Sequence, residues 1–394
     1  MRVLNFEASL SEIENGKCQL ADNSKTWLYN ENPDWFDIID FENDKAFLEP
    51  LLFYYFRRLI LKEKPVTTLE QIFYGYTPIQ NRTKRVKVIT DVDGTIYLPN
   101  YGYLNTHTQG IKEMEIFQTD SSSNDWICEN KVLSLIPIKY IKDNSFSIIS
   151  PYKTDIFREK GVVFIEDIEQ STNKAECSLI KTLNCMEHND SDFYAAIQKT
   201  TSEYCIFNST NFESFTALHH FGTAFLNLAG QDQTEAFYID DIAHQSGHTI
   251  FYTLTHEFEK FLKPHRLTLL NEFTQKDKDE RSVYGAFHGL FTYTTILHNL
   301  HNAVSNQWFK SSLIQEELLA RMGFYYDKFE KDLVFQGDDR ILTKEGWRYY
   351  EMFYTGFFAI KKEYHHIIKY FDYSNQDYNF NFAKFQQVNQ RITV

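Results

Sequence analysis

Cysteine and proline are scarce in this chain of 394 residues, which has only 8 prolines, and basic residues are fewer than acidic ones. The 5 cysteines are scattered and form no CxxC pair: Cys18, Cys128, Cys177, Cys185 and Cys205. This spacing predicts neither a disulfide framework nor a structural zinc site. Lys and Arg number 40 against 54 Asp and Glu, so the net charge of -14 argues against nucleic acid as a partner.

Long apolar runs are also missing, since no stretch approaches the roughly 18 apolar residues of a transmembrane helix. The first residues, MRVLNFEASLSEIENGK, lack the apolar core of a signal peptide. We therefore expect a cytoplasmic, reduced protein that does not bind membranes. The sequence gives no indication of its oligomeric state.

Apolar and aromatic residues, in contrast, are abundant. The chain is 43% hydrophobic and contains 35 Phe and 25 Tyr, enough for a large core and unlike a disordered protein. Periodicity predicts a helical N-terminal region at 1–80, including one apolar helix at 45–62. A mixed, β-rich region follows at 81–205, and a mainly helical region at 206–394. The fold class expected from this order is α+β.

The third region begins with a strand-like run at 215–228 (FTALHHFGTAFLNL), in which His219 and His220 would alternate across the strand. A helix should begin near Asp240 or Asp241, either of which is a good N-cap, and end before Pro264. Three more helices are predicted and listed here: 281–304, 310–333 and 344–370, the last capped by Thr343.

Two histidines lie four residues apart on the first of these helices. His244 and His248 share one helix face, one turn apart, so their imidazoles can converge on one metal ion. With 13 histidines in the chain, an HxxxH pair also arises by chance as two core histidines. Three features favour the metal interpretation: a strand-like segment precedes the helix, the small residues Ser246 and Gly247 lie between the histidines, and a further histidine follows at a plausible distance.

That second helix carries His288, the expected third ligand. Gly285, Ala286 and Gly289 flank it, and small neighbours allow close helix packing. Three protein ligands leave coordination positions open, as catalytic rather than structural sites do. Strands before an HxxxH helix, with a third His on the next helix, predict a zincin-like core. His298 and His301, further along the same helix, are expected to face solvent.

Gln245 occupies the position where a zinc protease carries its glutamate base. A carboxamide does not take up a proton at neutral pH, so Gln245 cannot replace that base. Ordinary peptide hydrolysis is therefore disfavoured, and the metal is expected to serve other chemistry.

Together these residues resemble the HExxH-motif family of peptide-modifying proteins encoded beside ribosomally made peptide natural products. The matching residues are His244, His248, Arg281, Gly285, His288 and Gly289, within a broader similarity over roughly 90–350. The sequence departs from the family at Gln245, Val283 and Tyr284. The resemblance implies an Fe(II)/2-oxoglutarate-dependent enzyme that hydroxylates the β-carbon of a side chain in a precursor peptide.

Within this interpretation each residue has an expected role. His244, His248 and His288 hold the metal, and Gln245 and Asp241 support the ligands from behind. Arg281 lies two helical turns before His288, where its guanidinium can grip the far carboxylate of 2-oxoglutarate. Arg281 could instead be a surface arginine at the start of a helix, without a role in binding. Asp241 could instead be a simple N-cap. Three histidines also suit zinc, so the metal stays open.

Three other functions remain as alternatives. A zinc-dependent hydrolase would need a base from elsewhere in the chain, and a non-catalytic peptide-binding scaffold would need none. The run TDVDGT resembles the nucleophile motif of haloacid-dehalogenase-type phosphatases, with Asp91 as nucleophile and Asp93 as acid and base. That fold requires a helix soon afterwards, whereas TIYLPNYGYL predicts a further strand and a hairpin turn at Asp93 and Gly94.

Overall fold

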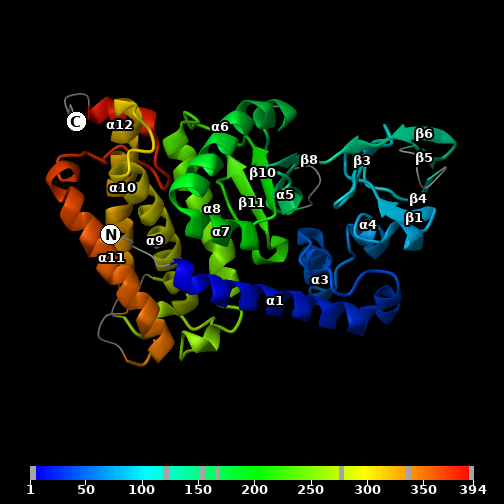
Figure 1. Cartoon of the computed structure of the whole chain (residues 1–394), viewed down its shortest axis with the longest axis horizontal. Coiled ribbons are helices and arrows are strands. Elements are labelled where there is room, and N and C mark those ends of the chain that lie inside the picture. The colour runs from blue at the N-terminus through cyan, green and yellow to red at the C-terminus, as the bar shows by residue number, and fades with distance from the viewer. Residues whose placement is uncertain are drawn as a thin grey trace. The chain divides into compact units, whose positions relative to one another are not determined.

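The computed structural model describes residues 6–118, 125–150, 156–165, 168–274, 279–333, 335 and 339–389. It divides into two compact units, each made from segments far apart in the sequence (Figure 1). Unit 1 contains residues 1–16, 174–200 and 228–394, and unit 2 contains residues 17–173 and 201–227. These boundaries do not follow the three regions expected from composition.

Unit 2 contains three small sheets. Its strands are β1 (Arg85–Ile89), β2 (Thr95–Leu98), β3 (Gly102–Asn105), β4 (Glu113–Gln118), β5 (Asp125–Cys128), β6 (Lys131–Ser134), β7 (Ile136–Pro137), β8 (Lys139–Ile141), β9 (Phe146–Ile149), β10 (Glu203–Phe207) and β11 (Thr223–Asn227). The sheet orders are β1-β4-β5-β6, β2-β3-β7 and β11-β10-β9-β8. The first two sheets are antiparallel, and in the third β9, β10 and β11 run parallel.

Helices complete unit 2 and build most of unit 1. They are α1 (Phe6–Glu31), α2 (Asp44–Phe47), α3 (Pro50–Ile60), α4 (Leu69–Phe73), α5 (Ile156–Glu159), α6 (Ile168–Asn189), α7 (Ser191–Thr200), α8 (Glu235–Leu254), α9 (Val283–Ser305), α10 (Ser312–Asp332), α11 (Lys344–Ile368) and α12 (Phe382–Val388). None of the helices in the described part of the chain is both long and apolar enough to cross a bilayer.

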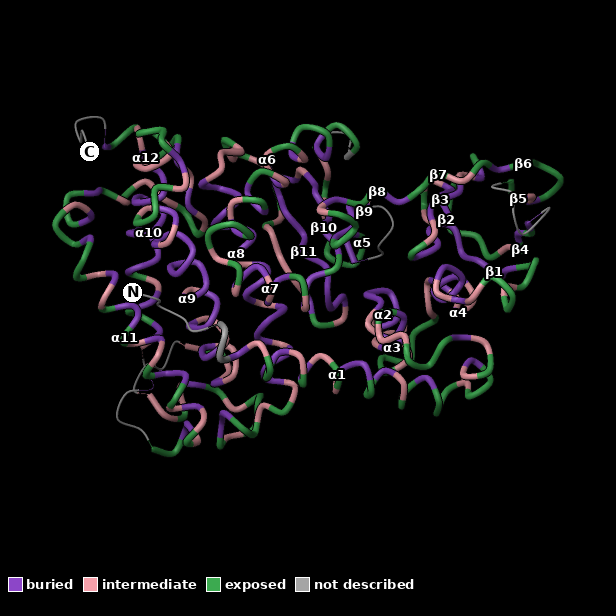
Figure 2. Tube along the Cα trace, in the orientation of Figure 1, coloured by how far each residue is buried: buried purple, intermediate pink, exposed green. Residues whose placement is uncertain are grey.

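Helix α9 is the centre of unit 1, where it packs against α8, α10 and α11. Most of its residues are buried, as the purple segments of Figure 2 show. The hydroxyl groups of Thr234, Ser282 and Thr343 accept backbone N–H groups at the starts of α8, α9 and α11. Each cap satisfies a donor that a helix start otherwise leaves unpaired. The caps therefore fix where the three helices begin.

The structure confirms the α+β class, the cap at Thr343 and the approximate extents of α9, α10 and α11. The predicted start of α8 is wrong: Thr234 is its N-cap, and Asp240 and Asp241 lie inside the helix. Its end is also earlier than predicted, at Leu254, where Thr255 is the C-cap.

Two other predictions in unit 2 need correction. The run at 45–62 is divided into α2 and α3, because Pro50 lacks an N–H and occupies the first turn of a new helix. The run at 215–228 is a strand only over Thr223–Asn227, and His219 and His220 lie in the 3₁₀ turn η4 (Leu218–His220) that precedes it. Gly222, with φ of +95°, turns the chain into the strand.

The phosphatase motif does not have the architecture that its chemistry requires. Asp91 accepts the N–H of Gly94 in a tight turn, and β2 follows at once. Strand β2 pairs antiparallel with β3, so no crossover helix follows the acidic motif. A turn is present at Asp93 and Gly94, but the predicted hairpin is wrong, because β1 pairs with β4 and β2 pairs with β3 in two different sheets.

Candidate metal centre

The structure brings His244, His248 and His288 together on the facing sides of α8 and α9. The ring centroids of His244 and His248 are 5.0 Å apart, and those of His248 and His288 are 4.6 Å apart. His248 Nδ1 and His288 Nε2 form a hydrogen bond of 2.8 Å. The three histidines singled out from the sequence therefore lie close together, and their role as metal ligands stays a prediction.

The donor atoms of this cluster are not yet arranged around one point. Across the described ranges, no group of three or more His, Cys, Asp or Glu side chains is placed to hold a metal ion. Two imidazole nitrogens bound at ~2.05 Å to one metal lie about 2.9 Å apart at a right angle and about 3.3 Å apart at the tetrahedral angle. The 2.8 Å separation of His248 and His288 is close to the first value. The separation of these two nitrogens is therefore compatible with two ligands of one metal ion.

Burial keeps all three imidazoles neutral at physiological pH. It lowers the pKa of His244 to about 4, with a contribution from the positive charge of Lys328. Burial also lowers the pKa values of His248 and His288 well below the usual value. Neutral imidazole is the form that binds metal, so the cluster has the correct protonation state for a metal site.

Aromatic side chains surround His288. Phe251 stacks on its ring with centroids 4.3 Å apart, and Tyr252 contacts it edge-on at 5.1 Å. Tyr284 lies 6.0 Å away and hydrogen bonds through its hydroxyl to Thr255. These rings fix the His288 imidazole and limit the access of water to it.

One glycine explains the close approach of α8 and α9. A Cβ atom at Gly247 would lie 2.4 Å from Thr295 Oγ1, which is shorter than any van der Waals contact. The same hydroxyl donates to the carbonyl of Ala243, joining the two helices. Of the other predicted small residues, Gly289 faces Asp332, whereas Gly285 faces only the Ser282 hydroxyl of its own turn.

We expect Gly247→Ala to destabilise the protein by about 1–3 kcal/mol, because the new methyl group overlaps the Thr295 hydroxyl. This outcome runs against helix propensity, which favours Ala over Gly by roughly 1 kcal/mol. Gly285→Ala is the matched control, since the nearest atom to its Cβ would be 3.3 Å away. Thermal unfolding of both variants measures the difference. Equal stability of the two would show that α8 and α9 tolerate the extra methyl group.

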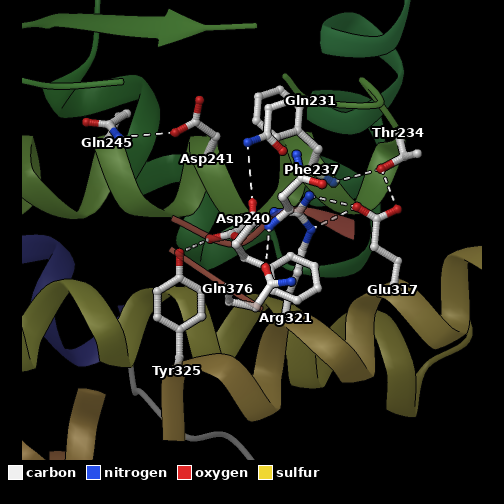
Figure 3. A network of polar contacts seen from close by, with 12 residues as sticks. Gln231, Thr234, Phe237, Asp240, Asp241, Gln245, Glu317, Arg321, Tyr325 and Gln376 are labelled. Atoms are coloured by element: carbon white, nitrogen blue, oxygen red, sulfur yellow. Dashed lines mark hydrogen bonds and ion pairs between the residues drawn. The ribbon is translucent and has the colours of Figure 1, made fainter. Parts of the chain in front are cut away.

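Gln245 and Asp241 bind each other. The Gln245 amide donates to Asp241 Oδ1 over 3.1 Å, one turn apart on α8, and both residues are buried (Figure 3). A carboxamide that donates to a carboxylate acts as an orienting group rather than as a proton acceptor. This contact fits the supporting role expected for the pair, although the role itself stays a prediction.

Asp240 takes part in a buried network that sequence reasoning missed. Arg321 of α10 pairs with Asp240 at 2.9 Å and with Glu317 at 2.7 Å. Tyr325 donates to Asp240, and Thr234 donates to Glu317 (Figure 3). Burial raises the pKa of Asp240, while Arg321 and Tyr325 act against that increase. The network ties α8 to α10 one turn before His244.

Arg281 is already engaged by two carboxylates. Its guanidinium binds both oxygens of Asp279 at 2.9 Å and both oxygens of Asp332 at 2.8 and 3.0 Å. Hydrogen bonds to Asp279 and Asp332 raise its pKa above the usual value. The predicted grip on 2-oxoglutarate therefore requires the cosubstrate to displace one aspartate. Neither aspartate is visible as a partner from the spacing that singled out Arg281.

His298 and His301 are buried rather than exposed to solvent. His298 binds Asp190 over 2.6 Å, and Asn302 donates to the same carboxylate over 2.8 Å. His301 contacts the Tyr364 hydroxyl at 3.3 Å. Both histidines have structural partners on other segments, Asp190 between α6 and α7 and Tyr364 on α11, so neither belongs to the metal centre.

Compared with known proteins, the sequence matches no protein-family model and no curated relative at a significant level.

Proposed function

We propose that this chain is a non-haem iron enzyme that hydroxylates the β-carbon of a residue in a ribosomally made precursor peptide. His244, His248 and His288 would hold Fe(II), which with 2-oxoglutarate and O₂ supplies the oxidising chemistry. The contact of three neutral, partly buried imidazoles from α8 and α9 carries the proposal. The peptide substrate comes from the family resemblance, and a zincin-like core is part of the same proposal.

The surrounding residues have assigned tasks. Phe251 and Tyr252 hold the ring of His288 and limit water access. Gln245 is tied to Asp241 and leaves the site without the glutamate base of a protease. Arg281 would bind a cosubstrate carboxylate in exchange for Asp279, which conserves a bidentate charge-assisted pair.

A zinc-dependent hydrolase is the second candidate, favoured by the contacts of Arg281. If Asp279 and Asp332 keep that guanidinium, the site has no assigned anchor for 2-oxoglutarate. Asp241 is a carboxylate on the same face of α8 as His244 and His248, because steps of three and four residues return to one face. It would then serve as the base that Gln245 cannot be.

Metal analysis of protein purified without oxygen tests these proposals. We expect about one iron per chain, lost in His288→Ala, because a third ligand is removed. His256→Ala is the control: His256 follows α8 and hydrogen bonds to the carbonyl of Thr253. Calorimetry with 2-oxoglutarate on the iron-loaded protein should show saturable binding that Arg281→Gln weakens. Tight zinc with peptide cleavage would favour the hydrolase, and failure to bind any metal would leave a peptide-binding scaffold.

A further inference from the structure

Unit 2 contains an apolar cleft, separate from the histidine cluster, with a volume of about 360 Å³. Residues of α1, helix α3 and the turn η4 line it. Its apolar lining consists of Leu20, Trp27, Phe53, Phe56, Ile60 and Leu218. Trp27 is 44% exposed and Ile60 is 60% exposed, so large apolar side chains face solvent here. The volume lies within the range of small-molecule sites, roughly 300–1,000 Å³.

The polar part of the lining consists of Asn23, Ser24, Arg57 and His219. His219 Nε2 is buried and has no hydrogen-bond partner among the described residues. Burial lowers the pKa of His219 to about 4, and the charges of Arg57 and Lys160 add to this effect. A neutral imidazole donates from one nitrogen, and a buried polar group without a partner costs roughly 1–3 kcal/mol. A ligand that bonds to this nitrogen would recover that cost.

Two further cationic side chains, Arg58 and Lys160, lie near Arg57. Glu159 accepts ion pairs from Arg57 at 2.9 Å and from Arg58 at 2.8 Å, and the Tyr54 hydroxyl also donates to it. Arg57 uses its Nη1 atom in this pair, and its side chain is 35% exposed. Lys160 adds a further cation nearby. Glu63 pairs with Arg58 at 3.1 Å, so the three cations Arg57, Arg58 and Lys160 face two carboxylates, in a chain whose overall charge is negative.

We propose that the cleft binds a small molecule with an apolar body and a terminal carboxylate. The apolar body lies between Trp27, Phe53 and Ile60, and the carboxylate accepts hydrogen bonds from Arg57 and from His219 Nε2. Burial of the body provides most of the affinity. The charge-assisted bonds select a carboxylate over an alcohol or a cation. This inference concerns unit 2, residues 17–173 and 201–227, and does not depend on the metal centre.

Isothermal titration calorimetry with decanoate, decan-1-ol and decyltrimethylammonium tests the proposal on the full chain. We expect decanoate to bind saturably at one site per chain. Decan-1-ol should bind at least about tenfold more weakly, because it cannot make the charge-assisted pair. The cation should bind more weakly still, next to Arg57. Equal affinity for the three compounds, or no saturable binding of decanoate, would overturn the proposal.

Two pairs of variants locate the site. Ile60→Glu places a charge in the cleft and should weaken decanoate at least tenfold. Leu61→Glu changes the next residue, which is 50% exposed and does not line the cleft, and should leave affinity within about twofold. Arg57→Gln should weaken decanoate but not decan-1-ol. Arg85→Gln on strand β1, which loses a surface pair with Glu115 and does not line the cleft, should affect neither. Unchanged decanoate affinity in both Ile60→Glu and Arg57→Gln would refute the site, and circular dichroism verifies the fold of each variant.

Discussion

Arg321→Met is expected to lower the free energy of unfolding of unit 1 by about 3–5 kcal/mol. The substitution keeps the length and apolar stem of the side chain but leaves Asp240 and Glu317 buried without their cation. These carboxylates are 4% and 1% exposed, so water does not replace the lost pairs. For a unit of roughly 200 residues, the corresponding decrease in the unfolding temperature is about 6–20 °C. Differential scanning calorimetry measures it.

Neutralising the two partners provides the control. The triple variant Arg321→Met, Asp240→Asn, Glu317→Gln replaces both carboxylates with neutral amides, so no uncompensated charge stays buried beside the apolar Met. It should recover a large part of the lost free energy of unfolding. Asp240→Asn alone should have a smaller effect, since the Tyr325 hydroxyl still has an acceptor. If Arg321→Met costs less than 1 kcal/mol, the two carboxylates must gain water or protons in the variant.

Raising the pH from 5 to 9 is expected to destabilise unit 2, and Glu203→Gln should remove much of this effect. Burial raises the pKa of Glu203 to about 7, although Thr223 and Tyr97 donate hydrogen bonds to it. Burial and the nearby Glu203 raise the pKa of Glu49 to about 8. Both carboxyls therefore keep protons in the folded state that the unfolded chain releases near its usual value of 4.5. Their stabilising contribution is fully present below pH 4.5 and is lost as pH rises through 7 and 8.

Glutamine keeps the shape and an acceptor oxygen but carries no charge. At pH 9 we expect Glu203→Gln to be more stable than the wild type by about 1–3 kcal/mol, and at pH 5 the two should be similar. Glu113→Gln is the matched control, because its exposed carboxylate pairs only with the exposed Lys64 on the surface. Urea unfolding across the pH range gives the comparison. Parallel profiles for wild type and Glu203→Gln would mean that Glu203 is already ionised at pH 5.

Local chemistry explains what could be read from the sequence. Thr343 begins α11 because its hydroxyl caps the helix three residues on, a contact encoded within four residues. His244 and His248 share a face because helix geometry requires it, and His288 reaches them because Gly247 has no side chain. Such features depend on spacing and residue size alone.

The features that the sequence could not predict depend on contacts between segments far apart in the chain. The sequence around Asp240 suggests an N-cap, but Thr234 caps the helix instead. The Asp240 carboxylate forms an ion pair with Arg321, which lies 81 residues later. Likewise, His298 can be buried because Asp190, 108 residues earlier, accepts a hydrogen bond from its Nε2 atom. The sequence separations between Asp240 and Arg321 and between His298 and Asp190 follow no helix or strand period. The sequence pattern therefore could not predict either contact. The metal, the cosubstrate and the peptide substrate remain proposals.

The division of the chain into interleaved segments has a consequence for its synthesis. Every residue of unit 2 has been made once the ribosome passes residue 227, whereas unit 1 still lacks α8 to α12 at that point. Unit 2 can therefore complete its core before the rest of unit 1, to which the first 16 residues belong, has been synthesised. We expect nascent chains arrested after residue 227, with room to leave the exit tunnel, to contain a protease-resistant unit 2. The histidine cluster, in contrast, becomes possible only after His288 has emerged.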